Sequence, residues 1–122
     1  MGERFVEKSD FETFKFNIRK SIKAKGQKLQ IKTRALSGNL TLKTHDRRIQ
    51  FIDPNGGNRD VTLPAEADSG DLLFFILNTA DGAEDLVVKD DSTATIVTIS
   101  QNEGGVVFCN GVVWKGFVGG IT

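Results

Sequence analysis

Residues 106–114 read Val-Val-Phe-Cys-Asn-Gly-Val-Val-Trp, and this stretch decides the fold class. Two apolar runs flank Asn110-Gly111, a pair that suits the positive φ angles which a two-residue type I′ turn requires at both central positions. The stretch therefore predicts a β-hairpin whose strands lie on either side of the turn.

Short apolar runs separated by turn residues continue upstream of this hairpin. Asp53-Pro54-Asn55-Gly56-Gly57 and Asp81-Gly82 mark turns, and Pro64 should end a strand because proline cannot donate to a sheet ladder. Eight short strands at this spacing are typical of a sandwich or barrel. The expected strands cover residues 40–44, 48–52, 59–63, 72–78, 86–89, 95–100, 106–109 and 112–118.

Charge divides the chain into two parts near residue 35. The chain has 122 residues, enough for one domain and too few for a multidomain enzyme. Residues 1–34 hold ten Lys or Arg and four Asp or Glu, a net charge of +6, whereas the other 88 residues hold six and twelve, a net charge of −6. The expected fold is an all-β, antiparallel β-sandwich or barrel-like (β-tulip-type) body over residues 35–122, with an extended basic N-terminal arm over residues 1–34.

Within the arm, apolar and polar residues alternate with the period of a strand that has one buried face. This pattern runs over residues 14–18 and 29–33. Because the alternation puts charges on one face and apolar side chains on the other, docking onto a protein surface is favoured over binding to nucleic acid, which remains an alternative. The residues expected to dock are Phe14, Phe16, Ile18, Arg19, Lys20, Leu29, Ile31 and Lys32.

One strand of the body, residues 72–77, is apolar on both of its alternating faces. A small domain has little interior in which to bury both faces, so part of this surface should be covered by the arm or by another subunit. We therefore expect a homo-oligomer, and the candidate subunit contacts are Leu72, Phe74, Ile76 and Val107.

Residues with catalytic chemistry are sparse. His45 is the single histidine and is interpreted as a surface loop residue, and Cys109, the single cysteine, is interpreted as an inert buried thiol. We expect no enzyme activity, metal or cofactor. No apolar run approaches the roughly 20 residues that a membrane-spanning helix needs. Trp114 is favoured as a packing residue, with a ligand-facing role as the alternative.

The body resembles small β-modules of tailed-bacteriophage virions, which occur in capsid decoration (cement) proteins and in head or tail fibre components. The resemblance covers residues 36–118. The motifs that carry it, in chain order, are the Leu63-Pro64-Ala65 turn, the Asn78-Thr79-Ala80 bend and the terminal Asn110-Gly111-Val112-Val113-Trp114.

This resemblance implies a virion structural protein on the outer capsid surface that clamps neighbouring subunits of the major capsid protein, often as a trimer, with the arm reaching over adjacent capsomers. A fibre module that binds a receptor or a glycan, with Trp114 and the acidic turns toward the ligand, is the second hypothesis. Nucleic-acid binding through the arm is the third.

Overall fold

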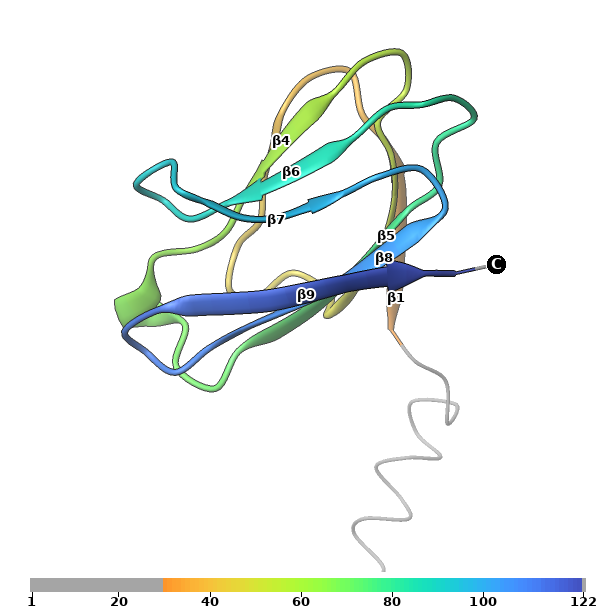
Figure 1. Ribbon diagram of the computed structural model, residues 1–122. Coiled ribbons are helices and arrows are strands. Elements are labelled where there is room, and N and C mark those ends of the chain that lie inside the picture. Colours follow the sequence, from red (N-terminus) through yellow and green to blue (C-terminus); the bar gives the residue numbers. More distant parts are fainter. Residues whose placement is uncertain (1–29, 122) are drawn as a thin grey trace, which may run out of the picture.

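The computed structural model describes residues 30–121 of the chain (Figure 1). This part contains nine strands and one short 3-10 helix, η1. The strands form a five-stranded sheet in the order β1-β3-β5-β8-β9 and a four-stranded sheet in the order β2-β4-β6-β7. The elements are β1 Ile31–Ala35, β2 Leu40–Thr41, β3 Ile49–Asp53, β4 Arg59–Thr62, η1 Glu66–Asp68, β5 Leu73–Asn78, β6 Leu86–Lys89, β7 Thr95–Ile99, β8 Glu103–Cys109 and β9 Trp114–Gly120.

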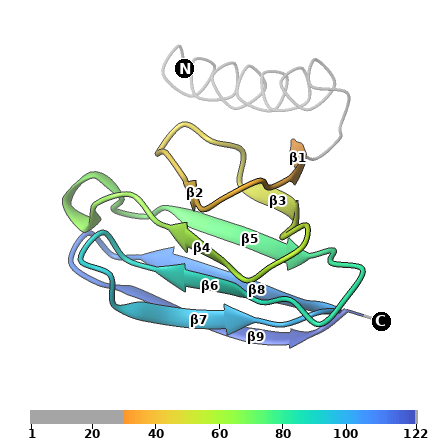
Figure 2. The same ribbon diagram turned by 90° about the horizontal axis from the view of Figure 1, so that it is seen from above.

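From β1 to β6 the chain crosses from one sheet to the other after every strand (Figure 2). When the chain comes back to a sheet, the new strand runs in the same direction as the previous strand of that sheet. As a result β1, β3 and β5 pair in parallel, and so do β2, β4 and β6. The last three strands reverse this pattern: β7 pairs antiparallel with β6, and the β8–β9 hairpin pairs antiparallel with β5. Both sheets are therefore mixed.

The all-β class is confirmed, and the expectation of wholly antiparallel sheets is wrong. Parallel neighbours need a crossover connection, and in this chain a strand of the opposite sheet serves as that crossover. The two sheets do not close into a barrel. They bury one hydrophobic core between them, whose members are Leu36, Leu42, Ile52, Val61, Leu63, Phe74, Ile76, Leu86, Val88, Ile99, Val107, Cys109 and Trp114.

Each of the eight expected strands overlaps an observed one, and a ninth strand, β1, lies where the arm was expected to end. β1 pairs with β3 along its whole length. The Arg47 Nη1 atom donates a hydrogen bond of 2.9 Å to the Ile31 carbonyl oxygen, and Arg34 Nε donates one of 3.0 Å to Gln50 Oε1. Residues 31–34 therefore belong to the sheet.

The hairpin over residues 106–114 is confirmed, but its turn differs from the expected type. Cys109 pairs with Trp114, so four residues form the turn, and of these Gly111 has a positive φ, +93°, whereas Asn110 does not. The Asn110 side chain closes the turn by accepting hydrogen bonds from the backbone nitrogens of Val112 and Val113. The side chain of Asn110 thus stabilises a turn in which only one residue, Gly111, has a positive φ.

Candidate functional site: an apolar sheet face

The outward side of the five-stranded sheet carries an unbroken row of apolar side chains. Strand register places five residues side by side, one from each strand. With strands about 4.8 Å apart, the row extends for about 19 Å across the sheet. The members of this apolar row are Ile31, Ile49, Phe75, Val106 and Phe117.

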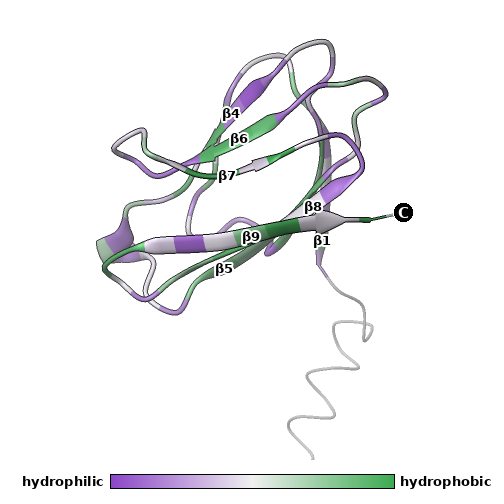
Figure 3. Cartoon of the chain, viewed as in Figure 1, coloured by the Kyte–Doolittle hydropathy of each residue, from purple (hydrophilic) through white to green (hydrophobic). Residues whose placement is uncertain are grey.

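Further apolar residues flank this row. Leu73 and its register partner Phe108 lie on one side, and Phe51 and Leu77 lie on the other. Several of these side chains remain accessible: Phe117 is 63% exposed, Phe108 44% and Phe75 38%. We call this surface the outer face; in Figure 3 the middle of β9, one of its strands, has apolar colouring, and a hydrophilic band lies nearer its start.

Beside Phe117 the outer face is hollowed where side chains are missing. Gly104 of β8 and Gly119 of β9 are register partners, and both point outward. A hollow of about 270 Å³ lies over them; its lining is Phe75, Gly104, Val106, Phe117, Val118, Gly119, Gly120 and Ile121. We call it the glycine hollow.

Charge is confined to the margins of the outer face. The outward positions of the five strands described above include two charged residues, Asp53 at the end of β3 and Lys115 near the start of β9. The other outward positions of these strands are uncharged. The largest continuous apolar patch on a protein surface is often functional, and patches larger than a few hundred Å² mark sites that bind proteins, membranes or ligands. The outer face is therefore a candidate interaction surface.

The residues expected to form subunit contacts lie one position along the strand from the residues that face outward. Phe74, Ile76 and Val107 are 0% exposed and belong to the core between the sheets, and Leu72 packs against that core. Side chains on a strand alternate between its faces, so the outward positions are their neighbours. The accessible apolar residues of β5 and β8 are thus Leu73, Phe75, Val106 and Phe108.

Trp114 is a packing residue. It is buried, its ring stacks on that of Phe74 with centroids 6.3 Å apart, and its Nε1 donates a hydrogen bond of 3.0 Å to the Pro64 carbonyl oxygen. The ligand-facing alternative for Trp114 is therefore wrong, because no face of the ring is open to a ligand.

Two of the expected docking residues, Ile31 and Lys32, lie in the edge strand β1, and Ile31 is the first member of the apolar row. The other six lie outside the described residues; they are Phe14, Phe16, Ile18, Arg19, Lys20 and Leu29. The chain therefore joins the outer face directly after residue 30.

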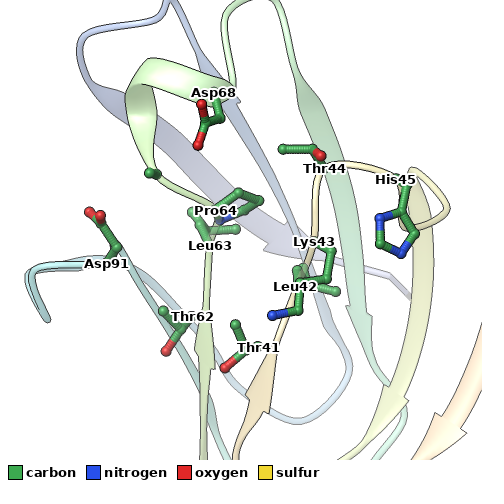
Figure 4. A pocket seen from close by; sticks show the side chains of 11 residues that line it. Thr41, Leu42, Lys43, Thr44, His45, Thr62, Leu63, Pro64, Asp68 and Asp91 are labelled. Carbon is green, nitrogen blue, oxygen red and sulfur yellow. The ribbon is translucent and has the colours of Figure 1, made fainter.

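A second hollow, of about 410 Å³, lies beside β2 and the end of β4 (Figure 4). Pro64 and Ala65 contribute apolar surface to it, over the buried side chains of Leu42 and Leu63. Its polar lining includes the side chains of Thr41, Lys43, Thr44, His45, Thr62, Asp68 and Asp91. Hydroxyl, amino, imidazole and carboxylate groups from separate segments thus surround one open space.

The remaining chemical candidates are isolated from one another. His45 is exposed in the turn after β2, and Cys109 is buried under the β8–β9 turn. In residues 30–121, no three His, Cys, Asp or Glu side chains come together as a metal site would require. Within the same residues, no helix is long and apolar enough to cross a membrane.

Comparisons of the chain with protein-family models, with curated proteins and with solved structures yield no match.

Proposed function

We propose that this chain is a non-enzymatic structural protein of a bacteriophage virion, most specifically a capsid decoration protein. In this proposal it binds the major capsid protein on the outside of the assembled head and links neighbouring subunits. The observation that carries the proposal is the apolar row of the outer face, because such a surface is suited to a protein partner. The resemblance of residues 36–118 to virion modules supplies the identity of that partner.

The position of the N-terminal segment supports a clamping role. The row begins at Ile31, directly after the segment that carries the chain's excess of basic residues. A partner seated on the outer face would therefore lie next to the point where this segment joins β1, and opposite charges on the partner would attract the segment. We propose that the segment extends as an arm over a neighbouring capsomer, and that the two sheets form a sandwich of β-tulip type.

Such a protein would stabilise the head by mass action. Contacts that form with the assembled shell and not with separated subunits shift the equilibrium toward the shell. Individual contacts can be weak, since a clamp that holds two sites at once gains from the high effective concentration of the second site. We propose a trimer as the unit that occupies each capsid position.

Co-sedimentation with expanded, undecorated shells of the cognate major capsid protein tests the proposal. We expect the full chain to pellet with the shells and Phe75→Asp to lower the bound fraction at least about tenfold, because the charge lies in the middle of the apolar row. Val112→Asp is the matched control, since Val112 is 79% exposed in the hairpin turn. A full chain that stays in the supernatant at every ratio rules out the decoration role.

Deletion of residues 1–29 shows how much of the binding to shells comes from the arm and how much from the outer face. Within residues 30–121, which the structure describes, the core extends from Leu36 to Trp114, so we expect the shortened chain to fold and to bind shells more weakly. If instead the full chain shifts DNA or RNA in a salt-dependent manner and the shortened chain does not, the arm binds nucleic acid and this part of the proposal fails.

The second hollow favours one other candidate, a fibre module that binds a glycan. Threonine hydroxyls, Lys43 and Asp91 around an apolar floor suit the hydroxyl groups and apolar ring faces of a sugar. Titration with a panel of oligosaccharides, followed by amide NMR, tests it. Saturable shifts at Thr41 and Thr62 that disappear in Thr62→Val favour the fibre module, and a spectrum without shifts excludes it.

A further inference from the structure

Two glycines of β9 are not required by the packing of the described residues, 30–121. A Cβ built on Gly119 or Gly120 meets no atom within 4 Å, and neither residue has a positive φ. Glycine within a strand costs stability because it loses more backbone entropy than other residues and packs no side chain. Such a glycine often marks a place where another backbone or ligand approaches closely.

Other glycines of the same hairpin behave differently. A Cβ on Gly105 would lie 2.8 Å from Ile99 Cδ1, and one on Gly116 would lie 2.5 Å from the Val106 carbonyl oxygen. These two are required by the packing of the monomer. The contrast singles out Gly119 and Gly120, which line the glycine hollow beside the exposed ring of Phe117.

We infer that the glycine hollow receives Phe117 of a second copy of this chain. Phe117 and Gly119 are two residues apart on one strand and point to the same side, so the protruding ring and the hollow are adjacent. When the symmetry axis of a closed oligomer passes near a surface patch, that patch contacts the same patch of another copy. The patch must then be complementary to itself, with both a protrusion and a hollow. β9 is an edge strand of its sheet, so another copy can approach it.

The size of the outer face limits the area of this contact. Five strands about 4.8 Å apart, with about three outward positions on each, give roughly 400 Å² per copy. Even a contact over the whole face would bury roughly 800 Å² in two copies, less than the roughly 1,200 Å² at which stable interfaces begin. A contact centred on Phe117 and the glycine hollow lies at the β9 end of the sheet and leaves the β1–β3 end of the outer face to the capsid protein. Neither of the two outward charged residues, Asp53 and Lys115, lines the glycine hollow, so the insertion of Phe117 buries no charge there. We therefore expect weak association that depends on protein concentration.

This inference rests on the proposed function for its biological role, because it names the surface that joins the copies of a decoration oligomer. Two measurements keep the two proposals apart. A chain that self-associates without binding shells removes the capsid role alone, whereas a chain that binds shells as a monomer removes the contact inferred here.

Sedimentation velocity of the full chain from about 1 to about 500 µM tests the contact. Wild type should pass from monomer to a small closed oligomer as the concentration rises. Phe117→Asp places a charge in the contact, and Gly119→Val puts a side chain into the hollow from a position where a Cβ meets no described atom within 4 Å. Each should raise the dissociation constant at least about tenfold.

Matched controls change the same residue types away from the hollow. Val112→Asp adds the same charge in the hairpin turn, and Gly38→Val adds the same side chain at another glycine where a Cβ meets no atom within 4 Å. Both should associate like wild type, and far-UV circular dichroism should confirm that all four variants are folded. A wild type that stays monomeric throughout, because residues 1–29 or another protein cover the face, overturns the inference. Association that neither Phe117→Asp nor Gly119→Val weakens overturns it as well.

Discussion

The side-chain nitrogen of Asn78, the last residue of β5, donates a hydrogen bond of 2.8 Å to the carbonyl oxygen of Ile99, the last residue of β7. The two strands belong to different sheets, so this bond joins the layers at one end of the core. Asn78 is buried, its Nδ2 also donates to the Glu84 carbonyl oxygen, and its Oδ1 accepts from the Ala80 nitrogen. A single amide thus satisfies three backbone groups.

Replacing Asn78 should therefore destabilise the whole domain. Asn78→Leu keeps the approximate size of the side chain but leaves two carbonyls and one N–H without their partner, and we expect the free energy of unfolding to fall by about 2–4 kcal/mol. Urea denaturation measures the loss. Asn39→Leu is the control, because the Asn39 amide accepts one exposed hydrogen bond, from the Asp60 nitrogen. Equal losses in the two variants would show that Asn78 is no more important than a surface amide.

The subunit contacts were predicted on the wrong side of β5 because residues 72–77 are apolar on both alternating faces, so the pattern does not tell which face lies against the core. In the structure Phe74, Ile76 and Asn78 share the core side, and three hydrogen bonds offset the cost of burying the amide of Asn78. Leu73 and Phe75 face outward.

Turn residues and apolar runs sufficed to locate eight of the nine described strands, since turn chemistry is local. The parallel pairing could not be predicted in the same way. The register of β1 with β3 and of β3 with β5 depends on how far the intervening strand of the other sheet carries the chain, which no local turn encodes. The apolar row follows from that register, so the candidate site could not be assembled from the sequence alone.

Trp114 provides a test of the packing role that the structure assigns to it. Because its ring is buried against Phe74 and its nitrogen is bonded to Pro64, Trp114→Ala should lower the free energy of unfolding by about 3–5 kcal/mol. The wild-type fluorescence should be that of a buried indole and should not change when oligosaccharides are added. Quenching by a sugar in the folded state would contradict the packing role.

Three glycines of the β8–β9 hairpin should respond differently to alanine. Gly105→Ala and Gly116→Ala force a Cβ against Ile99 or against the Val106 backbone, and we expect a loss of about 1–3 kcal/mol from each. Gly119→Ala meets no atom and should leave stability unchanged or raise it by up to about 1 kcal/mol. Thermal unfolding at low protein concentration, where the chain is monomeric, measures all three. A clear loss in Gly119→Ala would show that this glycine is needed within one copy.

Cys109 should be chemically silent while the domain is folded. Its thiol is buried, its sulfur accepts a hydrogen bond of 3.3 Å from the Gly111 nitrogen, and it lies 3.8 Å from the Glu66 carbonyl oxygen beneath η1. Disulfide reagents require an accessible thiolate, so the native chain should react at the rate at which the hairpin end opens. We expect one thiol per chain to react at once in strong denaturant and slowly in native buffer, as followed by the absorbance of the released thiolate. Fast reaction of the native chain would contradict this expectation and would mean that the turn over residues 110–113 opens readily in the folded domain.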